Sequence, residues 1–441
     1  MKMQADLMIR DGDFLNEEFE LEKGKSILIR DGKILDIDTA EELEKKYQWT
    51  EEIDGSRCIY MPGLIDAHMH TGQQLLRGRV LDEMPMIWTR IMLPYESTLT
   101  KEKMRLSTQA AAVEMIRSGT CGFIDAGSYY MEEAAAVYEE SGLRGAISYS
   151  TMDQKGLPRS IAMDAEEAVK RTDELYDGFH GKGNLKVYYS LRSLISCSRE
   201  LILAAAQRAK ERGTMLQAHM NEYPGEINFY MERFQMRPYE YLEKLGVLNE
   251  NFLGAHSLLL SENEKEILEK RGIKVCHCPF SNCGKAAPHT PELLKKGITA
   301  ALGTDGAAHG GLSLFNEMKI FRSVMNLTWG VPLSEPAIMP AKTILSMATE
   351  KGQQCLGGQD GVDGFLKKGA RADIVGIDRS RIYMAEYGKI SNTIMESVNA
   401  GDIRDSVSGG RILMKDYEIQ TLDEERILHD LRSYQERAES N

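Results

Sequence analysis

Two histidines one residue apart, His68 and His70, follow a short apolar run in the stretch PGLIDAHMHTGQQLLRG, residues 62–78. Residues i and i+2 of a strand point to the same side, so both imidazoles can face one metal ion if the strand continues through position 70. The pair is also compatible with two polar residues where a strand meets a loop. The interpretation therefore depends on whether other ligand types reach the same place.

Three further groups also follow apolar runs. His219 ends the run TMLQAH, His256 ends FLGAH, and Asp305 follows ITAALGT. If these runs are parallel strands of one barrel, their carboxyl ends meet at one mouth, and the four imidazoles and the carboxylate converge there. Imidazole and carboxylate are ligands of divalent metals such as zinc, so this arrangement predicts a metal site.

The elements that would position these groups alternate from residue 59 onward, with short apolar runs separated by stretches of helical periodicity. The predicted strands are 61–68, 121–125, 144–149, 185–191, 214–219, 252–256, 273–277 and 298–304. The predicted helices are 101–118, 131–141, 162–177, 199–211, 238–245, 261–271, 291–296 and 313–327. Eight such units predict an α/β fold with a (β/α)8 TIM barrel, although open doubly wound sheets use the same units.

Both ends of the chain instead contain short runs that are typical of β-strands. The first 57 residues contain ADLMIRDGDF and KSILIRDGKILDID, and strand-like runs return after about residue 360, before a closing helix near 423–437. Each end is too small to form a good core alone, so we predict that the two ends assemble into one β-sandwich. The predicted domains are residues 1–58 and 359–441 for the sandwich and 59–358 for the barrel.

Composition narrows the class of protein. The 441 residues are 42% hydrophobic and 27% charged, and the net charge of −13 argues against a nucleic-acid partner. No run approaches the ~20 apolar residues of a membrane span, and no apolar run of signal-peptide length occurs at the N-terminus. Seven scattered cysteines do not suggest a disulfide framework. We therefore expect a cytoplasmic protein with a small-molecule partner.

The ordered motifs MPGLIDAHMH…LLRG, QAHMNE, GAHS, CHCPFSN and GTDGAA resemble the amidohydrolase superfamily over nearly the whole chain. The branch that looks most similar contains S-adenosylhomocysteine and methylthioadenosine deaminases, guanine and 8-oxoguanine deaminases, and triazine hydrolases. The resemblance implies that His68, His70, His219 and Asp305 bind one divalent metal ion, zinc or alternatively iron, with His256 beside the metal-bound water. Family habit also suggests a homodimer. No position for a carbamylated lysine stands out at the end of the fourth strand, which agrees with the mononuclear branch of the family.

The residue types then predict a reaction. A metal held by imidazoles and a carboxylate lowers the pKa of its bound water toward about 7, which generates hydroxide at neutral pH. Asp305 can accept the water's proton. By family likeness Glu222, three residues after His219, protonates a ring nitrogen as the hydroxide attacks the amino-bearing carbon. His256 would orient the hydroxide and stabilise the tetrahedral intermediate, which collapses with release of ammonia.

The substrate stays open between two signals. Trp88, before the LPYE stretch, is similar to a tryptophan of adenosine-type members. Its side chain could form a wall of the substrate site or pack in the core. Gln73 is placed like a glutamine of the guanine-type and triazine members, and its amide could pair with the edge of a guanine, pterin or triazine ring. Asn282 and His309 are further candidate substrate contacts, although a surface role suits His309 better.

We predict deamination of an adenosine derivative first. The alternatives within enzymes are deamination of a guanine-type base and (chloro)hydrolysis of a triazine. The alternative of another class is a non-enzymatic scaffold. The roles of Arg144, Arg192 and His289 stay open. A separate structural zinc site at Cys276, His277, Cys278 and Cys283 is disfavoured, because Cys276 and Cys278 would face one side of the seventh strand and His277 the other.

Overall fold

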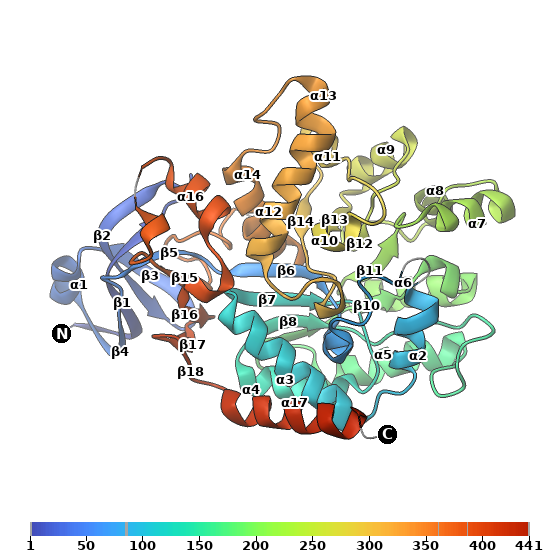
Figure 1. Ribbon diagram of the computed structural model, residues 1–441, viewed down its shortest axis with the longest axis horizontal. Helices are drawn as coiled ribbons and strands as arrows, with labels where there is room; N and C mark the ends of the chain where they lie inside the picture. Colours follow the sequence, from blue (N-terminus) through green and yellow to red (C-terminus); the bar gives the residue numbers. More distant parts are fainter. Residues whose placement is uncertain (1, 84–86, 360, 386, 440–441) are drawn as a thin grey trace.

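The computed structural model describes residues 2–83, 87–359, 361–385 and 387–439. A barrel of parallel strands occupies the middle of the chain, and a mixed sheet built from both chain ends lies beside it (Figure 1). In the described part of the chain, no helix is both long and apolar enough to cross a membrane.

The barrel strands form two hydrogen-bonded groups of parallel strands. The first group is β6 (Leu64–Met69), β7 (Thr120–Asp125), β8 (Arg144–Ile147) and β9 (Leu185–Val187), and the second is β10 (Tyr189–Leu191), β11 (Leu216–Met220), β12 (Phe252–His256), β13 (Lys274–His277) and β14 (Ala300–Leu302). The two groups meet within the predicted fourth strand, residues 185–191, which the structure divides into β9 and β10. There the amide of Tyr188 donates to the carbonyl of Ile147 at 3.0 Å, and that of Tyr189 donates to Met215 at 2.9 Å.

The other junction lies between β14 and β6. The amides of Thr304 and Asp305 donate to the carbonyl of His68 at 3.1 and 3.0 Å. A Cβ added at Gly303 would lie 2.7 Å from the backbone nitrogen and oxygen of His68, so only glycine permits this approach. The predicted parallel barrel is confirmed, and this close junction brings Asp305 to the end of β6.

Helices cover the outside of the barrel (Figure 1). Those that match predicted helices are α3 (Lys101–Arg117), α4 (Met131–Ser141), α5 (Ala165–Phe179), α6 (Arg199–Glu211), α8 (Pro238–Leu245), α9 (Glu262–Arg271), α11 (Thr290–Lys295) and α12 (Leu314–Met325). Those that the periodicity did not indicate are α2 (Leu93–Glu96), α7 (Pro224–Phe234), α10 (Pro279–Asn282), α13 (Val331–Leu333), α14 (Ala341–Ala348) and α15 (Glu350–Cys355). Most of these are only one or two turns long, too short for periodicity to reveal them.

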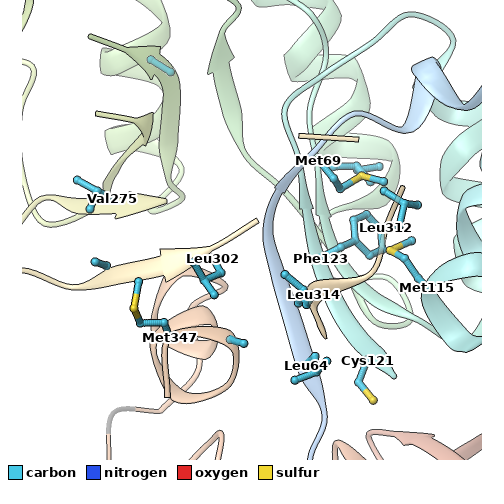
Figure 2. Packing of buried hydrophobic residues seen from close by; sticks show 14 of the residues in the cluster. Leu64, Met69, Met115, Cys121, Phe123, Val275, Leu302, Leu312, Leu314 and Met347 are labelled. Atoms are coloured by element: carbon cyan, nitrogen blue, oxygen red, sulfur yellow. The ribbon is translucent and has the colours of Figure 1, made fainter. Parts of the chain in front are cut away.

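Local chemistry sets several helix ends. The Thr100 hydroxyl accepts from the amide of Lys103 at the start of α3, and Ser261 and Glu264 form a capping box at the start of α9. Gly142 ends α4 at φ +78°, where a side chain would be strained. The apolar faces of these helices pack on the strands, and Figure 2 shows Met115 of α3 beside Met69 of β6 and Phe123 of β7.

The two chain ends share one mixed sheet. Its strands are β1 (Met3–Leu15), β2 (Leu21–Arg30), β3 (Lys33–Asp38), β4 (Tyr47–Asp54), β5 (Cys58–Pro62), β15 (Ile374–Asp378), β16 (Ile403–Ser408), β17 (Arg411–Lys415) and β18 (Glu418–Ile419). β5 and β15 pair antiparallel, which joins the N-terminal half to the C-terminal half. β1 pairs with β4 over its first part and with β5 near its end, and one buried apolar cluster draws on both halves.

Helices also occur in these ends. α1 (Ala40–Lys46) and α16 (Ile390–Ser397) form where the sequence suggested only strands. The closing helix α17 (Glu424–Glu439) lies along α3 (Figure 1), where Glu424 forms an ion pair with Arg117. The predicted domain boundaries near residues 58 and 359 stay a prediction.

Candidate metal centre and active site

Three imidazoles and one carboxylate meet at the carboxyl ends of the barrel strands. One ligand atom from each of His68, His70, His219 and Asp305 lies within 4.8 Å of the others. Oδ1 of Asp305 is 3.5 Å from Nε2 of His68 and 3.3 Å from Nε2 of His70, whose Nε2 is 3.2 Å from that of His219. The backbone stays extended at His70 (φ −125°), so the two β6 histidines can face the same point.

These residues fit a divalent cation. The His68 side chain is 1% exposed, yet neither of its ring nitrogens has a hydrogen-bond partner among the described residues. Such orphaned buried nitrogens are costly unless another group binds them. Burial holds the pKa of His70 and of His219 well below the usual imidazole range, which favours the neutral form that coordinates a metal. Three imidazoles and a carboxylate suit zinc.

The local backbone fixes the direction of two groups in the site. His256 and Asp305 both adopt positive φ, +67° and +59°, a conformation that is unfavourable for such side chains and recurs at functional sites. Ser281 donates to Oδ2 of Asp305 at 2.5 Å. The carboxylate therefore keeps Oδ1 toward the imidazoles, while Oδ2 faces the acid–base groups.

Glu222 and His256 stand next to the metal ligands. Nε2 of His256 is 3.6 Å from Oε1 of Glu222, and these two residues and Asp305 form a second tight group. The side-chain amide of Asn282 lies 3.0 Å from Nδ1 of His256. The hydrogen bonds around this amide are satisfied when the amide nitrogen of Asn282 donates to Nδ1 of His256. The proton of the neutral ring then sits on Nε2, which points into the site. Burial lowers the pKa of His256 to about 4, so the ring is neutral at pH 7.

A lysine that the sequence analysis did not single out lies in the same cluster. Nζ of Lys285 is 2.5 Å from Oε1 of Glu222 and 3.6 Å from Oδ2 of Asp305, and its side chain is 4% exposed. Burial alone would raise the pKa of Glu222, but the neighbouring Lys285 ammonium holds it below its usual range. No periodicity or strand end marks this loop lysine, so sequence reasoning had no signal for it.

A second polar network lies on the other side of His70. Nη1 of Arg192 is 2.7 Å from Nδ1 of His70, and its Nη2 donates to Oε1 of Glu96 at 2.7 Å. Gln73 donates to the same oxygen of Glu96 at 2.8 Å. Arg192 is therefore a buried residue of the site, and its position directly after the fourth predicted strand was the available signal.

A cavity of about 370 Å³ opens beside these groups. Its lining includes the predicted substrate contacts Gln73, Trp88, Glu222 and His309, whereas Asn282 lies behind His256 and outside the lining. Apolar side chains provide much of the remaining wall: Ile87, Met92, Ile195, Tyr223 and Pro224.

Other candidate residues lie elsewhere. Arg144 forms a buried ion pair with Asp373 at 2.9 Å, which links the barrel to the mixed sheet. His289 lies 3.3 Å from Glu292 on the outer loop before α11. Cys276 and Cys278 are buried, and neither belongs to a group of potential metal ligands in the described ranges.

Known proteins share this architecture. The model of the amidohydrolase family matches residues 59–413. The chain belongs to the amidohydrolase family. A 5'-deoxyadenosine deaminase of Methanosarcina mazei is 30% identical over 97% of this chain and 96% of its own, and a 5-methylthioadenosine/S-adenosylhomocysteine deaminase of Acetivibrio thermocellus is 30% identical over 98% and 99%. The crystal structure of an adenosine deaminase from Xanthomonas campestris with bound zinc superposes with a TM-score of 0.92 at 22% identity and covers both chains completely.

The resemblance stated from the sequence motifs is thus confirmed. As an amidohydrolase with deaminase relatives, the chain is a hydrolase acting on C–N bonds other than peptide bonds. Its metal site is built for a divalent ion.

Proposed function

We propose that this amidohydrolase is a mononuclear, metal-dependent deaminase of an adenosine derivative such as 5'-deoxyadenosine, methylthioadenosine or S-adenosylhomocysteine. It would convert the amino-bearing ring carbon to a carbonyl by adding water and releasing ammonia. The observation that carries the proposal is the placement of Glu222 and His256 beside the four ligand groups, next to a largely apolar cavity that Glu222 lines. The full-length similarity to adenosine-type deaminases supports the choice of substrate class.

In this proposal His68, His70, His219 and Asp305 would hold the ion, which would supply Lewis acidity and lower the pKa of a water to about 7. Asp305 would accept the proton that the water loses. His256 donates from Nε2 to the oxygen that adds to the ring carbon, because its Nδ1 is occupied by Asn282.

Glu222 moves a proton to the ring nitrogen next to the reacting carbon. In the described part of the chain, both contacts of its carboxylate use Oε1, so Oε2 is the oxygen that can reach the substrate. Trp88 and Tyr223 on the cavity wall offer faces for the ring. The same walls exclude water from the reacting carbon once a ring fills the cavity.

We further infer that the ion is zinc, with iron as the alternative, that the protein works as a homodimer and that it is cytoplasmic. The zinc-containing relative from Xanthomonas campestris supports the first inference. The buried, unpaired cysteines of the described residues agree with a reducing compartment.

A second candidate is a guanine-type deaminase. Gln73 lines the cavity with its buried Oε1 unpartnered among the described residues, and Arg192 lines it beside Gln73. An amide and a guanidinium together can bind a ring edge that carries a carbonyl and an N–H group. This arrangement favours a guanine, pterin or triazine ring over adenine.

A release-of-ammonia screen separates the candidates. The panel is 5'-deoxyadenosine, methylthioadenosine, S-adenosylhomocysteine, adenosine, guanine, 8-oxoguanine, a pterin and melamine, with chloride release from atrazine measured in parallel. Turnover of the adenosine group supports the proposal, turnover of guanine alone supports the second candidate, and turnover of none overturns the deaminase assignment.

A further inference from the structure

The segment that follows β13 reaches three different groups of the site. Ser281 and Asn282 of α10 contact Asp305 and His256, and Lys285, one turn later, contacts Glu222. Each contact joins this short segment to a residue from a different part of the barrel. The segment therefore arranges the acid–base groups relative to one another.

Among the described residues, the polar contacts of the Lys285 side chain lie inside this cluster. Nζ lies 2.5 Å from Oε1 of Glu222, donates to the hydroxyl of Ser281 at 2.6 Å, and lies 5.3 Å from the ring centre of Tyr223. It is outside the cavity lining, so it lies behind Glu222 and does not face a substrate.

A buried ammonium is expensive unless opposite charges surround it, and this one lies between two carboxylates, those of Glu222 and Asp305. Glu222 needs such a partner, because it stands on the turn between β11 and α7, after Asn221 at φ +48°. A glutamate side chain on a turn has three rotatable bonds and no fixed direction of its own.

We propose that Lys285 is a positioning residue that holds the Glu222 carboxylate by Oε1 and so directs Oε2 at the ring nitrogen of the substrate. This inference rests on the proposed function in one respect, the role of Glu222 as proton carrier. Misplacing a reacting group by about 1 Å costs about 10²-fold in rate. Loss of Lys285 should therefore lower kcat and change KM little.

The first test is a set of variants in the zinc-loaded enzyme. Lys285→Met should lower kcat about 30- to 100-fold with KM within about twofold, and Lys285→Arg should recover part of the loss because it restores a cation. The matched control is Lys265→Met, since Lys265 is another buried lysine, paired with Glu262 and Glu292 on the outer helices, and its loss should leave kcat unchanged.

A double-mutant cycle distinguishes positioning from a general structural role. If Lys285 acts through Glu222, adding Lys285→Met to Glu222→Gln should lower kcat by less than about threefold, because the group being positioned is already inactive. An equal loss in both backgrounds, or an unchanged kcat in Lys285→Met, would overturn the proposal.

A third measurement does not depend on activity. In metal-free protein, the drops in Tm caused by Lys285→Met and Glu222→Gln should be non-additive, since each removes the same ion pair. Additive drops would show that the two side chains do not pair in solution and would overturn the proposal. This readout remains valid if the substrate screen fails, so failure of the pairing and failure of the proposed function are distinguishable.

Discussion

Replacing Glu222 by glutamine removes one negative charge and keeps the size of the side chain. Glu222 is not among the four groups whose ligand atoms meet within 4.8 Å, so the variant should still bind one metal ion per chain. It loses the carboxylate that carries a proton to the ring, and general acid–base catalysis contributes about 10²–10⁴-fold. The expected loss in kcat corresponds to about 3–5 kcal/mol of transition-state stabilisation.

The assay is ammonia release together with metal analysis of the same preparation. The control is Glu232→Gln, which removes an equal charge from the exposed side of α7 and should change neither quantity. A Glu222→Gln enzyme with full activity would show that Glu222 is not the proton carrier. A variant that loses its metal would show that the acid–base group and the ligand group are not separate, contrary to the geometry.

Three further predictions address the ligand set, the substrate edge and a buried acid. Asp305→Ala removes both a ligand and the proton acceptor, so metal content should fall well below one per chain and kcat should fall by more than about 10²-fold; a fully metal-loaded variant would contradict this role. Gln73→Leu should lower kcat/KM for guanine-type bases by about 10- to 100-fold, the value of a lost buried hydrogen bond, and leave methylthioadenosine turnover within about fivefold; equal losses on both would contradict a ring-edge role. Burial raises the pKa of Glu226 from 4.5 to about 8, so its stabilising contribution is present below pH 4.5 and is lost as the pH rises through 8. Glu226→Gln should therefore raise Tm relative to the unmodified protein at pH 9 but little at pH 5, by an amount equivalent to roughly 2–4 kcal/mol; the same shift at both values would show that Glu226 is not a buried titrating group.

Strand ends explain why the histidines of the site could be located without a structure. His68, His219 and His256 each stand at the carboxyl end of a run with clear β character, and barrel topology brings such ends together. The sequence also predicted that the two chain ends assemble with each other, because each end alone is too small to form a core, and β5 pairs with β15 in the structure. Neither inference needed knowledge of side-chain contacts.

The contacts between loops could not be predicted in this way. Lys285 lies in a loop with no periodicity, and only the fold of α10 brings it to Glu222. Arg192 follows directly after β10, but its pairing with Glu96 joins residues 96 positions apart. Asn282 was expected at the substrate, yet the turn of α10 directs its amide to His256. Short helices such as α10 and α13 escape pattern analysis because a single turn carries little periodic signal.

The most direct test of the account is metal analysis of purified protein alongside the His219→Ala variant. We expect one divalent ion, zinc or iron, per unmodified chain and well below one in the variant, because His219 supplies one of the four groups that meet at the barrel mouth. A protein that binds no metal under loading conditions, or a His219→Ala variant that binds as tightly as the unmodified chain, would contradict it.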